Sequence, residues 1–352
     1  MTRILSIGLG GVGVIAAYTL QEFNKDVEVT AVIRLDYDKV TKDGYTISSI
    51  DYGGRKDGTS NITGFRPSHI VKSIDDAAEF GPFDYVVVST KLVPTNTPRD
   101  IWNEVTKHND KVFHDHSAIV LVQNGIFIEK YWEKLIPLGI SLISGVSYIS
   151  SVNTNGFVTQ YGHDSLLLGL FDSNKGDPKL VERFVDLYET DHNSSILDPN
   201  PRYTRWKKLL YNASFNTICC LTNLDVGKVY GLGEESEVIK PLMQEIQLAA
   251  NKDLATVGSE TLIKDDDIEL LLYAVKTADG QSDYQPSMLV DFRNNRPIEL
   301  EIILGNVIRQ FAEIGGDVKK EIPNLMFTYH LLKVVQYGLS NGFYKEPNEK
   351  EI

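Results

Sequence analysis

The feature that most constrains the fold is a glycine-rich loop near the start of the chain, Gly8-Leu9-Gly10-Gly11-Val12-Gly13. The loop follows an apolar run at 3–7 and opens a helical pattern at 12–23, so the pattern G-x-G-x-x-G stands at a strand-to-helix turn. In such a turn the first glycine permits a tight bend, the second admits a pyrophosphate, and the third lets helix and strand pack closely. Phosphates then lie at the helix N-terminus, where free N–H groups favour negative charge. The loop predicts a dinucleotide-binding unit, and a glycine-rich turn without a ligand is the alternative.

The first half of the chain alternates between short apolar runs and helical patterns. Strand patterns occur at 27–33, 84–89, 118–122, 140–149 and 156–170. The segment 41–69 is rich in Gly, Ser, Thr and Asp, and hairpins or loops are expected there. This succession predicts an α/β domain of the Rossmann type, with a doubly wound, mostly parallel sheet.

The pattern changes near residues 198–202, where two prolines and an asparagine mark a boundary. Beyond it, helical periodicity dominates, at 203–223, 235–257, 265–279, 297–314 and 323–339. The sequence therefore predicts two domains, a Rossmann domain at 1–199 and an all-α domain at 200–352. The charged tail KEPNEKEI, which ends the second domain, is expected to be frayed.

Composition narrows the class of protein. A net charge of −13 repels nucleic acid backbones, and no apolar run reaches the roughly 18 residues that span a bilayer, so neither nucleic acid nor membrane is an expected partner. The adjacent Cys219 and Cys220 are too close to pair, and free thiols suit a reducing compartment. A cytoplasmic protein is therefore expected. The alternative is a signal peptide in the first twenty residues, with Arg3 before a long apolar stretch, and it is disfavoured because four glycines interrupt that stretch.

The residue after the second strand bears on the choice of cofactor. Ligands in open α/β sheets bind beyond the carboxyl ends of the strands. NAD-binding folds usually place an acidic residue at the end of this strand, whereas this chain has Arg34, which can pair with a 2′-phosphate. Asp36 lies two positions further on and argues the other way, and a solvated surface arginine is the alternative. The strand end favours NADP.

Two further strand ends carry candidate cofactor contacts. The run at 84–89 leads into Lys91, which can hydrogen-bond ribose or attract an acidic substrate. The run at 118–122 leads into Asn124, which can hold ribose or nicotinamide. An ordinary loop lysine and a common Asn-Gly turn are the alternatives.

Three polar residues stand in an otherwise apolar helical pattern at 206–223. Lys208, Asn212 and Asn216 are spaced four apart, which places them along one face of a continuous helix. Buried polar groups must find partners, and a cation with two amides can grip a carboxylate and a carbonyl. The pattern therefore predicts a ligand site, with a solvated helix face as the alternative.

A second group of candidates lies late in the chain. Ser287 stands in the run QPSML, and Pro297 fits the first turn of a helix that carries Glu299. Compensation of the helix dipole is the alternative role for this glutamate. The polar turn around His114 and His116 has no further cysteine or histidine nearby, so no metal is expected there.

These pieces together resemble the ketopantoate reductase family (2-dehydropantoate 2-reductase) over nearly the whole chain. The resemblance rests on the loop GLGGVG, the Lys91 turn, QNG at 123–125, WKKLLYNASFN, PSMLVDF and RPIELEIILGN. It implies a Rossmann domain, a helical second domain, NADPH as cofactor and reduction of a 2-oxo acid, ketopantoate or a similar compound. Since an all-α second domain can pair, a homodimer is one expected assembly.

The resemblance also implies residue roles. Lys208 looks like the catalytic lysine, and Glu299 like the carboxylate that contacts the cofactor and helps set the protonation of that lysine. The residues that look like substrate contacts are Asn212, Asn216 and Ser287. The residues that look like cofactor contacts are Gly8, Leu9, Gly10, Gly11, Val12, Gly13, Arg34, Lys91, Asn124 and Ser150.

The chain departs from the family pattern at several points, which leaves its substrate open. Pro286 replaces the first serine of the SSML motif, and no clear match to a further substrate asparagine occurs at 224–228. An NADP-binding regulatory or interaction protein without turnover is therefore an alternative function. A neighbouring dehydrogenase acting on hydroxyacyl or sugar-acid substrates is disfavoured, because such enzymes lack this Lys-Asn-Asn helix.

Overall fold

Two compact units make up the chain. The computed structural model describes residues 1–55 and 59–344, so the predicted fraying of the tail at 345–352 lies outside the described residues. The strand unit comprises Met1–Lys91, Asn96–Asn124 and Ile128–Pro201, and the helical unit comprises Leu92–Thr95, Gly125–Phe127 and Arg202–Ile352. Two short segments from the first half of the chain therefore pack with the second unit, which the predicted division at residue 199 did not anticipate.

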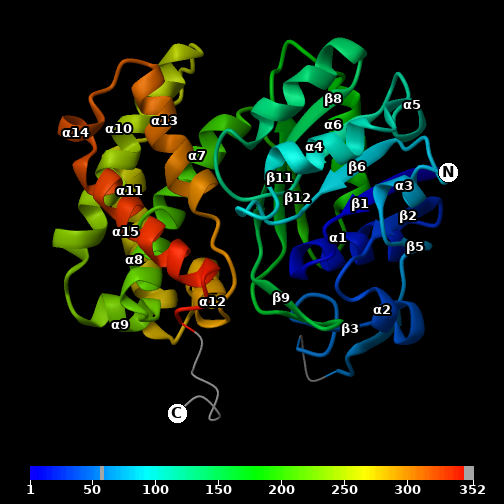
Figure 1. The fold of residues 1–352 in the computed structure, drawn as a ribbon, viewed down its shortest axis with the longest axis horizontal. Helices are drawn as coiled ribbons and strands as arrows, with labels where there is room; N and C mark the ends of the chain where they lie inside the picture. Colours follow the sequence, from blue (N-terminus) through cyan, green and yellow to red (C-terminus); the bar gives the residue numbers. More distant parts are fainter. Residues whose placement is uncertain (56–58, 345–352) are drawn as a thin grey trace. The chain divides into compact units, whose positions relative to one another are not determined.

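An eight-stranded sheet forms the centre of the strand unit (Figure 1). Its strands are β1 (Thr2–Ile7), β2 (Val27–Val32), β5 (His69–Val71), β6 (Tyr85–Val88), β7 (Ala118–Leu121), β8 (Ser141–Tyr148), β11 (Ser165–Leu170) and β12 (Ser194–Leu197). They are ordered β12-β11-β8-β7-β6-β1-β2-β5, and every neighbouring pair is parallel except β8 and β11. The predicted doubly wound, mostly parallel sheet is confirmed.

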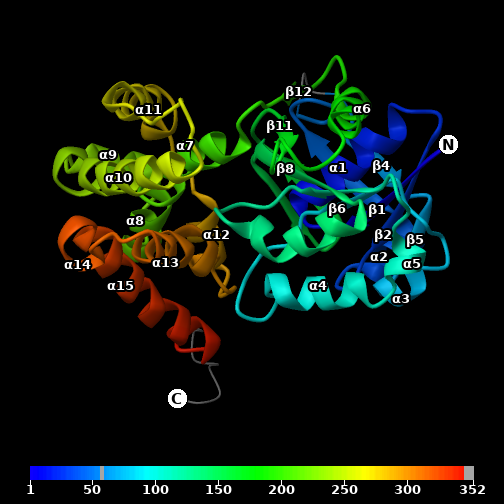
Figure 2. The same cartoon turned by 90° about the horizontal axis from the view of Figure 1, so that it is seen from above.

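Helices cover both faces of this sheet. They are α1 (Gly11–Glu22), α2 (Tyr37–Asp43), α3 (Ile74–Ala77), α4 (Pro98–Thr106), α5 (Asn109–Val112), the 3₁₀ segment η1 (Ile128–Leu138) and α6 (Pro178–Tyr188). Figure 2 shows α1 and α6 on one face, with α3, α4 and α5 on the other. Every residue of β6 and β7 is buried as a result, which explains why their sequences are continuous apolar runs.

A second sheet of four strands was not anticipated. It is ordered β4-β3-β10-β9 and consists of β3 (Tyr45–Ser49), β4 (Ile62–Phe65), β9 (Ser151–Thr154) and β10 (Phe157–Gln160). The antiparallel pair of β3 and β4 fits the hairpin expected within 41–69, but β3 also pairs in parallel with the distant β10. Periodicity within either segment carries no information about a partner more than 100 residues away.

Buried polar residues join the second sheet to the first. The carboxylate of Asp51 accepts hydrogen bonds from the side chain of Gln160 and from the backbone N–H of Asp164, and Asp164 accepts one from the Tyr188 hydroxyl at 2.8 Å. Burial raises the pKa of Asp164 to about 6, while the hydrogen bond from Tyr188 acts in the opposite direction. These contacts bring the loop after β3 to the turn before β11.

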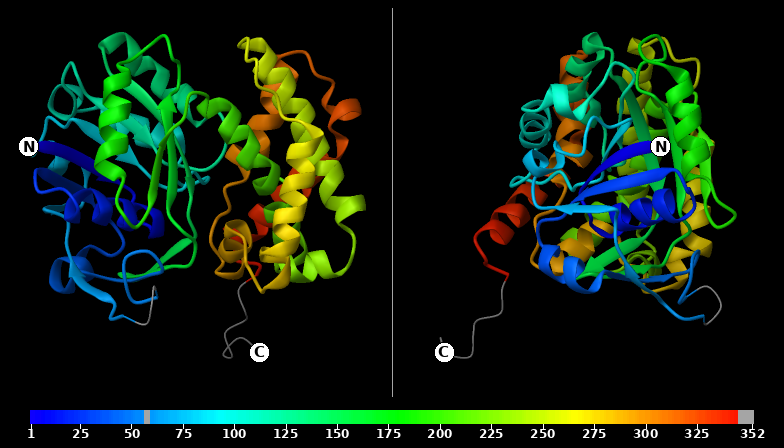
Figure 3. Two further views of the ribbon diagram at one scale, coloured as in Figure 1. Left: turned by 180° about the vertical axis from the view of Figure 1, so that it is seen from behind. Right: turned by 90° about the vertical axis from the view of Figure 1, so that its right-hand side faces the viewer.

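The helical unit is built from twelve described helical segments (Figure 3). They are α7 (Pro201–Asn212), α8 (Phe215–Thr222), α9 (Val226–Gly231), η2 (Glu235–Ile239), α10 (Lys240–Thr256), α11 (Asp265–Thr277), η3 (Asp279–Gln281), α12 (Ser287–Arg293), η4 (Glu301–Gly305), α13 (Asn306–Glu313), α14 (Val318–Glu321) and α15 (Pro323–Ser340). Among the described residues, none of the helices of either unit is long and apolar enough to cross a membrane.

The predicted continuous helix at 203–223 is wrong, because the chain breaks it after Asn212 and restarts it at Phe215. The break contains neither proline nor glycine. The Ser214 hydroxyl donates to the carbonyl of Leu210, and the Thr217 hydroxyl donates to the carbonyls of Ala213 and Ser214. Such bonds from side chain to backbone compete with the helical ladder and bend helices.

The predicted helix at 297–314 also begins later than expected. Helical structure starts at Leu300, so Pro297 and Glu299 precede the helix rather than forming its first turn. The N–H of Ile298 donates to the Gln336 side chain of α15 at 2.9 Å, a tertiary contact that holds this segment outside the helix. The first helical residues then form the π-helical segment η4, a type of irregularity that is frequent near functional sites.

Candidate functional site

Two glycines of the loop are required by the fold itself. Gly8 has a φ of +101°, and a Cβ there would lie 2.5 Å from the backbone nitrogen of Thr90. A Cβ on Gly13 would lie 2.0 Å from the carbonyl oxygen of Gly8, so only glycine lets α1 approach β1 this closely. These are the tight-turn and packing roles that the motif predicts.

Gly10 has no such structural requirement. Its φ of −74° suits any residue, and a Cβ there would meet no atom within 4 Å. The N-terminal N–H groups of α1 point out of the helix beside it, as in any helix N-terminus. Open space over a glycine at a helix N-terminus fits a phosphate group, so the residues present suit the predicted dinucleotide. Of the other loop residues, Leu9 is buried and Val12 is partly buried.

Gly11 places the segment of Ser150 beside the loop. A Cβ on Gly11 would lie 2.4 Å from the backbone of Ser151, the first residue of β9. Ser150 itself is partly buried, and its carbonyl accepts from the N–H of Tyr161 at 2.7 Å. Ser150, a predicted cofactor contact, therefore directly precedes the residue that packs against the glycine loop.

The turns after β6 and β7 are tied to each other and to the loop. Thr90, which precedes Lys91, packs against Gly8. The Gln123 side chain, which precedes Asn124, donates to the Thr90 carbonyl at 2.7 Å. Lys91 is exposed and Asn124 partly buried. Both predicted cofactor contacts therefore lie at the carboxyl edge of the sheet, where the glycine loop also lies.

Arg34 lies two residues after the end of β2 and makes an ion pair with Glu104 of α4, with the side chains 54% and 44% exposed. Asp36 instead accepts from the Asn153 side chain at 2.7 Å, and the same amide donates to the Leu9 carbonyl at 3.0 Å. The carboxylate of Asp36 is therefore held close to the glycine loop, while the guanidinium of Arg34 is held by an acidic side chain.

Lys208 lies on α7 and is partly buried. The pKa of its ammonium group is lowered to about 8, mainly by burial and also by the nearby charge of Arg205, while Glu299 acts in the opposite direction. The next residue, Lys207, lies 47% exposed and pairs with Asp267 of α11 at 2.8 Å. The two adjacent lysines therefore lie in different surroundings, Lys207 paired with an acidic side chain and Lys208 next to Arg205 and Glu299.

Glu299 is only 5% exposed, although it lies in no helix. One of its carboxylate oxygens accepts from the backbone N–H of Leu92 at 3.1 Å. Leu92 directly follows Lys91 and packs with the helical unit. Two of the predicted site residues, Lys208 and Glu299, are therefore electrostatically coupled inside one unit, although 91 positions separate them in the sequence.

The structure also brings Asn216 and Ser287 together. The Asn216 side chain donates to the Ser287 hydroxyl at 3.3 Å and accepts from the N–H of Met288 at 2.8 Å. Because of the helix break, Asn216 lies on α8, while Lys208 and Asn212 remain on α7 one turn apart. Asn212 is the last residue of α7 and partly buried.

Sequence reasoning missed two residues. Arg205 is 4% exposed and lies one helical turn before Lys208, a spacing that the sequence displays but that gives no sign of burial. Asn153 joins Asp36 to the glycine loop from β9. No local signal marks it, because its role depends on the pairing of the second sheet.

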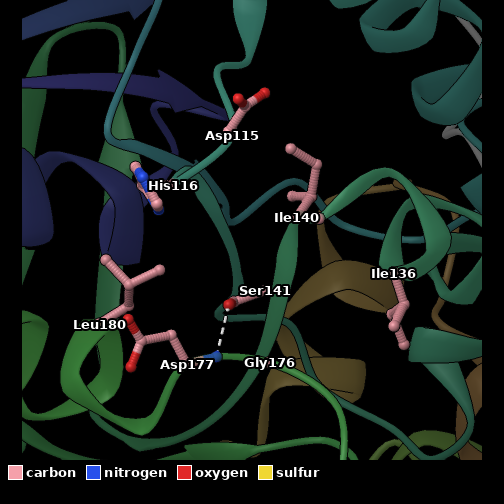
Figure 4. Close-up of a pocket in the computed structure, with 9 residues that line it drawn as sticks. Asp115, His116, Ile136, Ile140, Ser141, Gly176, Asp177 and Leu180 are labelled. Carbon is pink, nitrogen blue, oxygen red and sulfur yellow. Dashed lines mark hydrogen bonds between the residues drawn. The ribbon is translucent and has the colours of Figure 1, made fainter.

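A small pocket lies at the opposite edge of the sheet (Figure 4). Its lining includes His116 before β7, Ser141 at the start of β8 and Asp177 before α6, whose N–H donates to the Ser141 hydroxyl at 2.9 Å. These are amino ends of strands, so the pocket is separate from the predicted cofactor site. Within residues 1–55 and 59–344, no cluster of three or more His, Cys, Asp or Glu side chains is placed to hold a metal ion.

Comparison with known proteins identifies the family. The model described as Ketopantoate reductase PanE/ApbA matches residues 4–173, and the model of its C-terminal region matches residues 200–336. An uncharacterised protein of Saccharomyces cerevisiae is 36% identical over 359 residues, which cover 96% of this chain and 95% of that protein.

Solved structures share the fold over both units. The crystal structure of 2-dehydropantoate 2-reductase from Methylococcus capsulatus is 27% identical, with a TM-score of 0.76 over 96% of this chain and 98% of that one. A D-mandelate dehydrogenase, solved with NADH and anilino(oxo)acetate, is similar in fold alone, with a TM-score of 0.73 at 17% identity over 97% of this chain and 100% of that one. With matching models for both halves and a relative similar over almost its full length, the chain belongs to the ketopantoate reductase family of nicotinamide-dependent oxidoreductases.

Proposed function

We propose that this protein reduces a 2-oxo acid, ketopantoate or a similar compound, to the 2-hydroxy acid with NADPH. The observation that carries the proposal is the environment of Lys208, a partly buried ammonium group whose pKa lies at about 8. A proton donor works best when its pKa lies near the working pH, and this lysine meets that condition. Membership of the family supplies the reaction class.

In the proposed mechanism, the glycine loop binds the pyrophosphate and Lys208 acts on the substrate. When bound, the reduced nicotinamide supplies the hydride that adds to the carbonyl carbon. Negative charge then develops on the carbonyl oxygen, and the Lys208 ammonium stabilises it and donates the proton. Glu299 favours the protonated form of Lys208, which keeps the donor charged at neutral pH.

Substrate binding is assigned to the polar side chains of the helical unit. Asn212 and Asn216 are proposed to bind the carboxylate and hydroxyl groups, together with Ser287, which Asn216 already contacts. The cationic pair of Arg205 and Lys208 supplies local positive charge in a chain whose net charge is −13, which an anionic substrate needs. Pro286 at the first serine of the family motif leaves the identity of the acid open.

The choice of NADPH over NADH is part of this proposal. Arg34 supports it, because a guanidinium after β2 can bind a 2′-phosphate once it leaves Glu104. Asp36 beside the loop favours NADH, because a carboxylate at this position can bind a ribose 2′-hydroxyl. The D-mandelate dehydrogenase of similar fold was solved with NADH. Arg34 carries more weight in this proposal because its side chain stays half exposed beside Glu104.

The experiment is an assay of NADPH and NADH oxidation over a panel of 2-oxo acids, with Lys208→Ala beside Lys207→Ala. We expect Lys208→Ala to lower kcat by about 10²–10⁴-fold, as loss of a general acid does, and Lys207→Ala to stay near the wild type. Activity that survives Lys208→Ala contradicts the assignment of the proton donor. Tight NADPH binding without turnover of any acid supports the regulatory or interaction protein instead.

Assembly and location stay predictions. A homodimer is tested by light scattering of the full chain over a range of concentrations, and a monomer at every concentration contradicts it. The cytoplasmic location rests on the free thiols, and Cys219 and Cys220 are both buried and unpaired with each other.

A further inference from the structure

Arg205 is a buried cation one turn from the proposed proton donor. Its side chain is 4% exposed, and its guanidinium donates to the carbonyl oxygen of Gly125 at 3.2 Å. Arg205 disfavours the charged form of Lys208, so placing this second cation in the interior has an electrostatic cost. A structural role of Arg205 would account for that cost.

Gly125 is held on the helical unit from several sides. Its φ is +91°, and a Cβ there would lie 2.6 Å from Ile302 of η4. The next residue, Ile126, donates to the carbonyl of Ile302 at 3.0 Å and accepts from the Asn306 side chain at 2.7 Å. Arg205 adds one more hydrogen bond to the contacts of the segment Gly125–Phe127, which directly follows the proposed cofactor contact Asn124.

Glu299 makes the equivalent contact with the other short segment of the helical unit. It accepts from the N–H of Leu92, which follows the proposed cofactor contact Lys91. The two charged groups that act on Lys208 therefore each hold the backbone just beyond a proposed cofactor contact. Gln123 and Thr90 join the same two turns on the other side of those contacts.

We propose that Arg205 is a positioning residue, which ties the turn of Asn124 to the helix of Lys208 and thereby links cofactor binding to the state of the proton donor. This inference rests on the proposed function. A cofactor that moves Asn124 moves Gly125, and with it the guanidinium beside Lys208. By reciprocity, the protonation of Lys208 alters the affinity for the cofactor.

Charged side chains from two segments act on Lys208. On its own helix, Arg205 disfavours the ammonium form, and from the segment before η4, Glu299 favours it. The remaining cations of α7 are engaged elsewhere, because Lys207 pairs with Asp267 and Arg202 pairs with Asp253 of α10 at 2.6 Å.

The test compares Arg205→Gln, Arg205→Met and Arg205→Lys in the full chain. Removing a neighbouring positive charge raises the pKa of Lys208, so in the Gln and Met variants the basic limb of kcat/KM should move up by about one pH unit. Arg205→Met also removes the donor to Gly125 and should raise the KM for NADPH about tenfold. Arg205→Gln should raise that KM less, and Arg205→Lys should restore the basic limb.

Arg202→Gln is the matched control on the same helix. It breaks an ion pair with the buried Asp253 and should lower the melting temperature without moving the basic limb. The inference is overturned if the Gln and Met variants keep both the wild-type basic limb of kcat/KM and the wild-type KM for NADPH. In that case an inactive Lys208→Ala still leaves the proposed function standing. Retained activity of Lys208→Ala overturns both.

A second measurement covers the case in which the Arg205 variants do not fold. The affinity of the wild type for NADPH, measured by fluorescence between pH 7 and 9, should change about threefold or more, and Lys208→Met should remove that change. A wild-type affinity that is flat across this range overturns the inference.

Discussion

The chain assembles the glycine loop and the polar site around Lys208 in different ways. The second group, called here the Lys208 constellation, consists of Lys208, Asn212, Asn216, Ser287 and Glu299. The loop is six consecutive residues whose roles follow from backbone geometry: Gly8 and Gly13 are each required by the fold, whereas a Cβ on Gly10 would meet open space. The constellation draws side chains from α7, α8, α12 and the extended segment before η4. A site made of backbone depends on local sequence, whereas a site made of side chains depends on the packing of distant segments.

This difference has a chemical consequence. The loop contributes N–H groups that do not titrate, so the phosphate binding proposed for it does not depend on a protonation state of its own. The constellation contributes ionisable groups whose pKa values are set by burial and neighbours. The proposed phosphate binding therefore depends on backbone groups, whereas the proposed proton transfer depends on buried ionisable side chains.

The largest effect is expected within the loop. Gly13→Ala places a Cβ 2.0 Å from the Gly8 carbonyl and should destabilise the fold by about 3 kcal/mol or more. Gly10→Ala meets open space, so it should keep the wild-type melting curve and weaken NADPH binding about tenfold. Thermal melts and NADPH titrations separate the two. Wild-type NADPH affinity in Gly10→Ala contradicts the phosphate role.

The ionisable groups of the constellation should give kcat/KM a characteristic pH dependence. Since the proposed proton donor is the ammonium form of Lys208 and its pKa is about 8, kcat/KM for reduction should be level below pH 8 and fall tenfold per unit above it. At pH 10 the loss amounts to about a hundredfold. A profile of initial rates between pH 6 and 10 checks this, and a plateau that extends to pH 10 excludes Lys208 as the titrating donor.

Non-local assembly also affects a carboxyl group of the strand unit. Burial raises the pKa of Asp164 to about 6, so its contribution to stability is present below the unfolded pKa of about 4 and is lost as the pH rises through 6. Asp164→Asn still accepts from Tyr188 and avoids that loss. Relative to the wild type, the variant should gain about 2 kcal/mol between pH 4 and 7 in urea unfolding. An equal stability difference at both pH values contradicts the shift.

Alanine variants of the two asparagines in the constellation should differ in their free energy of unfolding. Asn216→Ala leaves the N–H of the buried Met288 without its acceptor and should cost about 1–3 kcal/mol, in addition to raising the KM for the acid. Asn212→Ala, at the partly buried end of α7, should raise that KM with little loss of stability. Urea unfolding beside steady-state kinetics measures both quantities. Equal unfolding free energies of the two variants would falsify the assignment of a structural bond to Asn216.

The smallest effect concerns the choice of cofactor. Arg34→Ala should raise the KM for NADPH about tenfold and leave that for NADH unchanged. Glu104→Gln frees the guanidinium and should lower the KM for NADPH a few-fold, since exposed ion pairs are weak. Lys39→Ala, which breaks an exposed pair with Asp43, is the control. If Arg34→Ala affects both cofactors equally, Arg34 does not read the 2′-phosphate.

Much of the fold was predictable because it is encoded in local patterns. The buried strands β6 and β7 are continuous apolar runs, and the helices of the second half have clear 3.6-residue periodicity. The second sheet was missed because β3 and β10 pair across more than 100 residues. The break between α7 and α8 was missed because Ser214 and Thr217 look like ordinary helix residues until their hydroxyls contact the backbone.

The sequence by itself determined the glycine loop, the alternation of strands and helices, and the residues from which a site can be made. The tertiary structure alone decided that Asn216 meets Ser287, that Glu299 stands outside its helix on the N–H of Leu92, and that Arg205 is buried beside Lys208. The reason is physical. Backbone conformation is governed by neighbours in sequence, whereas burial and charge coupling depend on which distant segments exclude water from a given side chain.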